Sequence, residues 1–169
     1  MRRALYILAD LRDEDLLWLN RAGRIVEVGP GETLIQSGRQ VMDLFFVITG
    51  DFDVVGPTGL IAQLAQGDVT GEMSFLEGRL PSASVVARSR GQVLAISAEV
   101  VEAHLREDVA FAARFHRALA VFLSDRLRAA GSGAASGGVE DLEGRLLDSL
   151  HVAGDRFNRL MDLLAGRAR

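Results

Sequence analysis

The stretch that decides the fold runs over residues 67–87 and reads GDVTGEMSFLEGRLPSASVVA. A strand is expected to end at Gly71, and a helix of one turn is expected to start near Met73. The chain then turns at Gly78 and Pro81 and resumes as a strand. A glycine directly before a short helix lets backbone N–H groups point outward, and such groups form a natural cradle for an anion.

Side chains of the same stretch add polar groups to this cradle. Glu72 supplies a carboxylate that is well placed to accept a hydrogen bond from a sugar hydroxyl, and Ser82 and Ser84 can add hydroxyl donors from the returning side. By themselves these residues fit a plain β-turn-helix corner as well as a ligand pocket. The pattern of the whole chain is needed to separate the two interpretations.

Signals for short strands surround the stretch, from residue 24 to residue 97. Residues 44–48 form a continuous apolar run, typical of a strand buried on both faces, whereas residues 51–54 alternate between polar and apolar. Glycine turns at 29–31 and 56–59 separate the strands. Many short strands with glycine at the corners predict a mainly β domain that forms a barrel, roll or sandwich.

Helical patterns flank these strands. Residues 13–22 begin with three acids, which favours a helix N-terminus. Ser97 can cap a short helix, and Asp108 can cap a longer one that runs to about Arg128. The apolar stripe of the longer helix is wide, which predicts contact with more than one neighbour. Its members are Phe111, Phe115, Ala118 and Phe122, with Leu119, Leu123 and Leu127 beside them.

The C-terminal part predicts a tethered helix. Residues 131–138 consist of glycine, serine and alanine, and we interpret them as a flexible linker between a domain over 1–130 and an amphipathic helix within 139–169. From Leu146 onward the apolar positions of that helix follow heptad spacing. Two glycines weaken it by about 1 kcal/mol each relative to alanine. It is therefore expected to need a partner surface on its own domain, on a second copy or on another protein.

The composition argues against several classes of function. The net charge of −4 is unlike that of a general nucleic-acid binder, and the N-terminal apolar run is too short for a signal core or a membrane span. There is no cysteine, and His104, His116 and His151 have no neighbours at metal-ligand spacing. No nucleophile elbow, Walker loop or zincin motif is present. We expect a cytoplasmic protein that is not an enzyme and holds no metal or cofactor.

The order and spacing of these features resemble the cyclic nucleotide-binding domain family, whose members include catabolite-activator regulators, regulatory subunits of cyclic-AMP-dependent kinase and nucleotide-gated channels. The resemblance spans about residues 11–128 and implies a β-roll of the jelly-roll type (double-stranded β-helix), with an N-terminal helix and a long C-terminal helix. In the family, that long helix closes the pocket and often pairs two subunits. The resemblance rests on Pro30-Gly31-Glu32, Gly38, Phe45-Phe46-Val47-Ile48-x-Gly50, Gly67-Asp68, the residues from Gly71 to Leu76, and Pro81-Ser82-Ala83-Ser84.

Matched position by position, the resemblance implies most of a nucleotide pocket. Gly71 and the N–H groups of Met73 and Ser74 match the phosphate cradle of the family. Glu72 matches the residue that accepts a hydrogen bond from the ribose hydroxyl. Contacts to the base would come from the long helix, near Ser124.

One position departs from the family pattern. The family places an arginine after the proline, where it pairs with the cyclic phosphate, but here Pro81 is followed by Ser82, Ala83 and Ser84. Loss of a charge-assisted hydrogen bond of about 1.5–3 kcal/mol lowers affinity about tenfold to over a hundredfold. Arg79 lies in the same loop and is a candidate to reach back into the cradle.

The sequence therefore predicts a stand-alone regulatory protein that senses cyclic AMP, cyclic GMP or a cyclic dinucleotide and signals by repositioning helices. The alternative is a degenerate roll without nucleotide that acts as a dimerisation or protein-interaction module. A homodimer is expected through the long or the terminal helix, or a protein partner through residues 139–165. The chain that follows the long helix is too short for a winged helix-turn-helix, so DNA binding is not expected.

Overall fold

The computed structural model describes residues 10–131 and 143–167 and divides into two compact units. One unit comprises residues 21–104, and the other combines the chain before and after it. The first unit holds the strands and the second holds the long helices. The predicted linker residues 132–138 and the predicted helical residues 139–142 lie outside the described residues.

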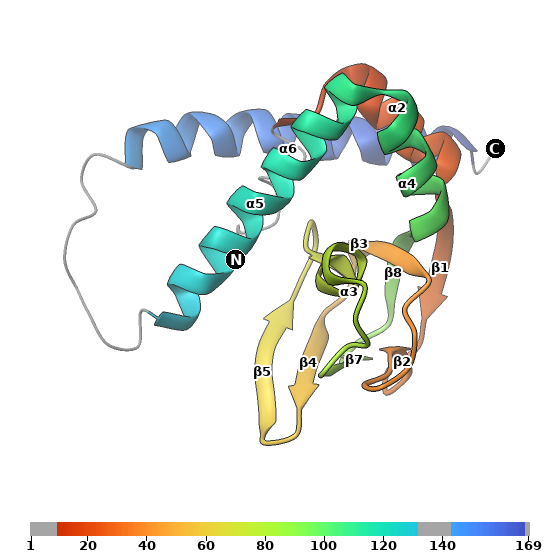
Figure 1. Ribbon diagram of the computed structural model, residues 1–169, viewed down its shortest axis with the longest axis vertical. Coiled ribbons are helices and arrows are strands. Elements are labelled where there is room, and N and C mark those ends of the chain that lie inside the picture. The colour runs from red at the N-terminus through yellow and green to blue at the C-terminus, as the bar shows by residue number, and fades with distance from the viewer. Residues whose placement is uncertain (1–9, 132–142, 168–169) are drawn as a thin grey trace. The chain divides into compact units, whose positions relative to one another are not determined.

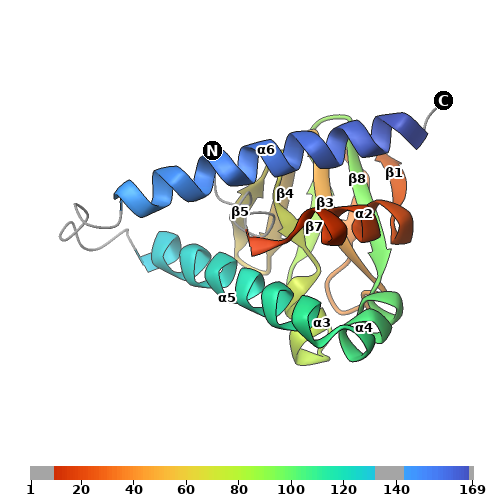
Figure 2. The ribbon, with the colours of Figure 1, turned by 90° about the horizontal axis from the view of Figure 1, so that it is seen from above.

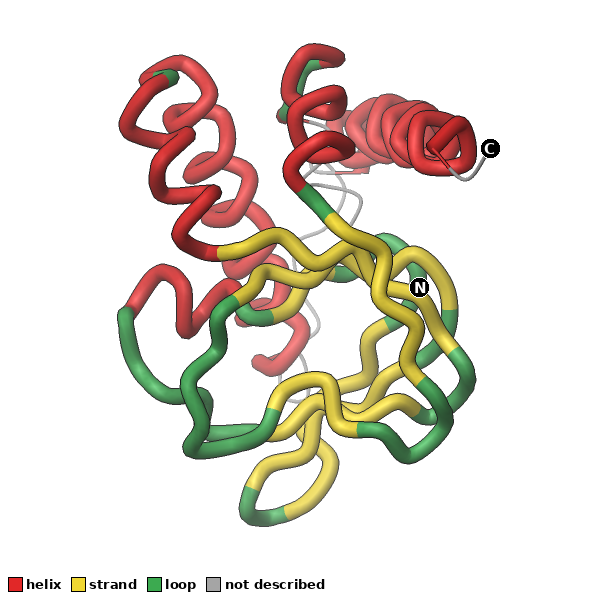
Figure 3. Tube along the Cα trace, turned by 90° about the vertical axis from the view of Figure 1, so that its right-hand side faces the viewer, coloured by secondary structure: helices red, strands yellow, loops and turns green. Residues whose placement is uncertain are grey.

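The unit of residues 21–104 is a roll of two four-stranded antiparallel sheets (Figures 1 and 3). One sheet has the order β1-β8-β3-β6 and the other the order β2-β7-β4-β5. The mainly β roll predicted for this part of the chain is confirmed. Its strands are β1 (Arg24–Val28), β2 (Thr33–Ile35), β3 (Asp43–Thr49), β4 (Phe52–Gly56), β5 (Gly59–Leu64), β6 (Val69–Thr70), β7 (Ser84–Ala87) and β8 (Gly91–Ser97).

The core of the roll is apolar and draws on both sheets. The five residues 44–48 of β3 are all buried, as their continuous apolar run predicts. In β4, Phe52 is fully buried, whereas Asp53 is half-buried, which follows the predicted alternation. The buried members of the core are Val28, Ile35, Phe45, Val47, Phe52, Leu64, Val85, Ala87, Val93 and Ala95.

Two short helices belong to the same part of the chain. Helix α3 (Glu72–Glu77) follows β6, and helix α4 (Ala98–Glu107) follows β8. Asp68 organises the approach to α3, because its carboxylate accepts the N–H of Ala65 at 2.7 Å and its carbonyl accepts the N–H of Val47 at 2.8 Å. β6 then pairs with β3, and Gly71 follows directly after its last residue. Figure 1 shows α3 at one end of β4 and β5.

The second unit contains α2 (Asp13–Ala22), α5 (Val109–Gly131) and α6 (Glu143–Arg167), which Figure 2 shows from above. The N-terminal bounds of α2 and α5 agree with the sequence, and Asp108 caps α5 through the N–H of Phe111 at 2.8 Å. The side chain of Arg114 on α5 donates two hydrogen bonds to Asp15 on α2, at 2.8 and 2.7 Å. The stripe from Phe111 to Phe122 is buried as predicted.

The terminal helix α6 also buries its apolar positions within the single chain. Phe157, Leu160 and Leu164 are exposed by 8%, 2% and 7%. The guanidinium of Arg159 on α6 lies 2.8 Å from the carboxylate of Asp13 on α2. The terminal helix therefore packs against a surface of its own chain that includes α2. The sequence left three partners open for this helix, namely its own domain, a second copy or another protein, and the structure shows a surface of the same chain.

Candidate functional site

The corner before α3 requires a glycine. Gly71 has φ 88°, in the left-handed region, and a Cβ atom there would lie 2.7 Å from the carbonyl oxygen of Asp43. The helix starts at Glu72, one residue earlier than predicted, and the N–H of Phe75 donates to the carbonyl of Gly71 at 3.0 Å. The N–H groups before Phe75 have no acceptor within the helix. They form the donor set that an anion would use.

Glu72 carries the carboxylate of this corner and is 2% exposed. Thr70, two residues before Glu72, is also buried, whereas Met73 is 55% exposed and Ser74 is half-buried. A buried carboxylate is costly unless hydrogen-bond donors surround it. The burial of Glu72 is a feature that the sequence pattern does not show, because an acid in a first helical turn is usually solvated.

The returning loop is tied to the loop after β2. The N–H of Gly38 donates to the carbonyl of Pro81 at 2.9 Å, and the N–H of Ser37 donates to the hydroxyl oxygen of Ser84 at 3.0 Å. The Ser84 hydroxyl is therefore engaged as an acceptor while its own O–H stays available as a donor. Ser82 is exposed and Ala83 is half-buried. The loop is thus held at both sides of Ser82.

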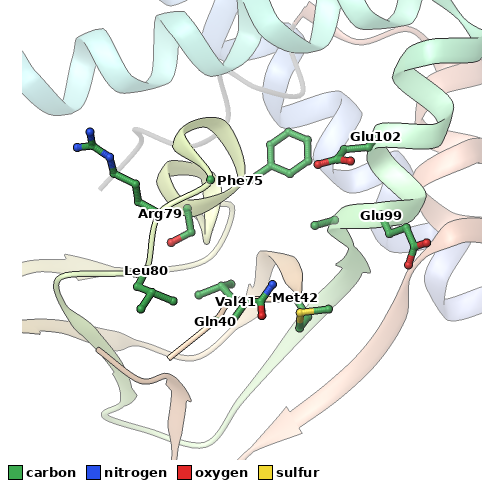
Figure 4. A pocket seen from close by; sticks show the side chains of 11 residues that line it. Gln40, Val41, Met42, Phe75, Arg79, Leu80, Glu99 and Glu102 are labelled. Atoms are coloured by element: carbon green, nitrogen blue, oxygen red, sulfur yellow. The ribbon is translucent and has the colours of Figure 1, made fainter. Parts of the chain in front are cut away.

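The remaining candidate residues, Arg79 and Ser124, take no part in these loop hydrogen bonds. Arg79 is exposed and makes no hydrogen bond or ion pair with any residue that the structure describes. Figure 4 shows its side chain directed away from Glu99 and Glu102. Ser124 is exposed on α5 and belongs to the other compact unit.

Two residues that sequence reasoning missed position the strand behind Gly71. The guanidinium of Arg24 on β1 grips the carboxylate of Asp43 at the start of β3 with two hydrogen bonds, at 3.1 and 2.7 Å. These hydrogen bonds raise the pKa of Arg24 further above its ordinary value, although burial opposes the rise. Strand β8 lies between β1 and β3, so only the sheet order brings the two side chains together.

The described residues show neither a candidate metal site nor a helix that could span a membrane. Residues 10–131 and 143–167 contain no group of three histidine, cysteine or acidic side chains that could hold a metal ion. Every helix in the same ranges is too short or too polar to cross a bilayer.

The structure defines the class of the domain as a roll of two four-stranded sheets with a glycine-headed helical turn after β6. The model of the cyclic nucleotide-binding domain matches residues 25–108, and the chain belongs to this family. The match contains all eight strands apart from the first residue of β1, together with the Gly71 corner and the returning loop.

Curated relatives match a little over half of the chain. Proteins of Mycobacterium tuberculosis and Mycobacterium bovis, each called an uncharacterized NTE family protein, are 34% identical over 98 residues. The matched part is 57% of this chain and 17% of the length of those relatives.

Solved structures share the fold. A cyclic nucleotide-binding domain from Methylobacillus flagellatus has a TM-score of 0.70 at 20% identity, with 82% of this chain and 85% of that chain covered. The regulatory subunit of a cAMP-independent protein kinase A from Trypanosoma brucei has a TM-score of 0.56 at 23% identity, covering 74% and 41%. A triple mutant of that subunit, with one threonine replaced by arginine, is described as bound to cAMP in its A site and has a TM-score of 0.55 at 23% identity, covering 76% and 44%.

Proposed function

We propose that the chain is a regulatory protein that binds a cyclic nucleotide at the corner formed by Gly71, Glu72, Met73 and Ser74. The observation that carries the proposal is a buried carboxylate, Glu72, directly after a left-handed glycine in a domain of the cyclic nucleotide-binding family. Cyclic AMP, cyclic GMP and a cyclic dinucleotide are the candidate ligands.

Each group at the corner has a distinct role in this proposal. The N–H groups of Met73 and Ser74 donate to the cyclic phosphate, since they precede the first hydrogen bond of α3. The carboxylate of Glu72 accepts from the ribose hydroxyl, and this charge-assisted bond compensates part of the cost of its burial. The free O–H of Ser84 adds a donor from the returning loop.

The loop supplies no cation in the family position, because Ser82 stands there. The expected affinity is therefore lower by about tenfold to over a hundredfold than with an arginine. The Trypanosoma proteins are in line with a need for such a cation: the parent is described as cAMP-independent, and the form described as bound to cAMP carries three substitutions, one of them threonine to arginine.

Signalling is proposed to pass to the helices. The ligand stabilises one arrangement of α3, and the long helix α5 and the tail helix α6 respond because their packing differs between the liganded and ligand-free states. The domain supplies regulation in this proposal and performs no chemistry on its ligand.

Calorimetric titration of the full chain with cyclic AMP, cyclic GMP and cyclic di-GMP tests the proposal. At least one ligand is expected to bind more tightly than about 1 mM. Glu72→Gln should weaken that binding by about tenfold or more, because the ribose hydroxyl loses a charged acceptor. Glu77→Gln, an exposed residue of the same helix, is the control and should leave binding unchanged. Absence of binding by all three ligands would contradict the proposal.

The second candidate function is a degenerate roll that acts as a dimerisation or protein-interaction module. Ser82 in place of the family arginine favours it. Sedimentation of the full chain against a chain ending at Ala130 tests the self-pairing form. A dimer that becomes a monomer on truncation supports it, and identical monomeric masses remove it.

A further inference from the structure

A row of three paired residues crosses one sheet of the roll and ends one residue before Gly71. Phe45 on β3 pairs with Ala95 of β8 on one side and with Thr70 of β6 on the other. Directly paired residues of antiparallel strands point to the same face of their sheet. Phe45 and Ala95 belong to the apolar core between the two sheets. The Thr70 side chain therefore points into the interior of the roll.

The hydroxyl of Thr70 is the polar end of this row. The residue is 5% exposed, and its hydroxyl makes no hydrogen bond with any residue in the parts of the chain that the structure describes. Burial of a hydroxyl in apolar surroundings without a partner lowers stability. The hydroxyl oxygen is not sealed, so a molecule inside the roll can reach it.

The threonine at the end of β3 provides a contrast. The hydroxyl oxygen of Thr49 accepts the N–H of Gln92 at 3.1 Å and so fastens β3 to β8. The pairing of Thr70 with Phe45 uses the backbone and leaves the hydroxyl out. An apolar β-branched side chain such as valine would fill the same place in the strand without an unsatisfied polar group. The Thr70 hydroxyl therefore calls for a partner from outside the fold.

The chemistry on the two sides of Gly71 indicates what that partner is. An ionised Glu72 carboxylate only accepts hydrogen bonds, at about four positions, so it can accept one from a ligand beside its contacts within the chain. A phosphate oxygen would meet this carboxylate as a like charge. An alcohol hydroxyl suits both residues, because it donates to the carboxylate and still accepts from the O–H of Thr70.

We infer that Thr70 is a specificity-determining residue of the proposed site. Its O–H donates to the 2′-hydroxyl of the bound nucleotide, which is the free sugar hydroxyl of a 3′,5′-cyclic nucleotide, and this hydroxyl donates to Glu72. The inference rests on the proposed function and adds a residue to it. A ligand without the 2′-hydroxyl leaves both side chains unpaired, so the site selects ribose over deoxyribose.

Calorimetric titration of the natural chain and of Thr70→Val tests the inference. The probes are cyclic AMP and cyclic GMP, each with its 2′-deoxy form. Thr70→Val should lower the affinity for the ribose ligand by about threefold to tenfold, which corresponds to the loss of one neutral hydrogen bond. The same change should alter the affinity for the 2′-deoxy ligand by less than about twofold, since the partner hydroxyl is already absent.

Urea unfolding of the ligand-free chains separates binding from folding. Thr70→Val should unfold at an equal or higher urea concentration, because the fold loses no hydrogen bond. Thr49→Val is the control: it should unfold at a lower concentration, since the N–H of Gln92 loses its acceptor, and it should leave ligand affinity unchanged. Thr70→Ser keeps the hydroxyl and should bind within about threefold of the natural chain.

The outcomes distinguish this inference from the proposed function. Absence of binding by the natural chain contradicts the proposed function and, with it, the role of Thr70. Binding that is weakened by Glu72→Gln but unchanged in Thr70→Val overturns the inference and leaves the proposed function standing. An equal loss for the ribose and deoxyribose ligands also overturns it. So does earlier urea unfolding of free Thr70→Val, since the hydroxyl would then serve the fold.

Discussion

A Cβ atom on Gly71 would lie 2.7 Å from the carbonyl oxygen of Asp43, closer than real Cβ atoms approach backbone. The backbone of Asp43 is held in the sheet, since Asp43 pairs with Ser97 of β8, and its carboxylate also accepts two hydrogen bonds from the guanidinium of Arg24. The backbone at the start of β3 therefore limits the space in which the chain turns into α3. The close approach explains why a residue with no side chain occupies the head of the cradle.

Gly71→Ala should destabilise the protein more than Gly78→Ala does. Both glycines have positive φ, 88° and 64°, so alanine costs about 1–2 kcal/mol in backbone strain at either position. Only the Cβ at Gly71 meets other atoms, since nothing lies within 4 Å at Gly78, and this overlap adds about 1–3 kcal/mol. Urea unfolding followed by circular dichroism measures both costs. Equal values for the two variants would show that the backbone at Asp43 shifts to make room for the added Cβ atom.

Ser82→Arg should strengthen cyclic nucleotide binding by about tenfold to over a hundredfold, because it restores a charge-assisted bond to the phosphate. Ser82 is exposed, so the longer side chain is accommodated without repacking. Calorimetry with cyclic AMP provides the measurement. Ser82→Gln is the control, with similar bulk and no charge. If the arginine and glutamine variants bind alike, the cradle does not hold a phosphate.

Asp15→Asn should lower the free energy of unfolding at pH 7 by about 3 kcal/mol, because it leaves Arg114 without its buried partner. Burial by itself raises the pKa of Asp15, but hydrogen bonds from Arg114 and from the N–H of Arg12 outweigh it and hold the pKa below its ordinary value of 3.8. The carboxylate thus contributes fully above about pH 4, and its contribution is lost as pH falls through the lower folded pKa.

The check on Asp15 is a series of urea unfolding curves between pH 2 and pH 7. The natural chain should lose stability more steeply below about pH 4 than the Asp15→Asn variant, so the gap between them should narrow toward pH 2. A gap that stays constant across this range would mean that the pair does not govern the acid response.

Leu160→Ala in α6 should destabilise the chain by about 2–5 kcal/mol, because it removes a side chain that is 2% exposed. Asn158→Ala, at an exposed position two residues earlier, should change stability by less than about 0.5 kcal/mol. Thermal melts at two protein concentrations measure both. A cost that depends on protein concentration would mean that α6 is buried against a second copy rather than within its own chain.

Secondary structure followed closely from sequence. The acids at 13–15 mark the start of α2, Asp108 caps α5, and the apolar run at 44–48 is a strand with every residue buried. These features depend on neighbours along the chain, so a local pattern is enough to reveal them. The need for glycine at 71 was visible in the same way, since the chain must turn there from a strand into a helix.

The burial and contacts of the side chains around the cradle cannot be predicted from local sequence patterns. The burial of Glu72 and the engagement of the Ser84 hydroxyl by Ser37 depend on how the two sheets are ordered. The hydrogen bond between Arg24 and Asp43, behind Gly71, forms only because β8 brings β1 and β3 into one sheet. A pocket beside α3 joins Met42 to Glu99, which lie far apart in sequence.

The sequence alone therefore determined the strands and helices, the family and the residue types at the corner, because each of these is written in local pattern and spacing. The tertiary structure decided that the Glu72 carboxylate is buried, that α6 buries its stripe within one chain, and that a pocket lined by Ser74 and Glu99 lies beside α3. The physical reason is that burial and charge environment depend on segments brought together by folding, and no window of sequence contains them.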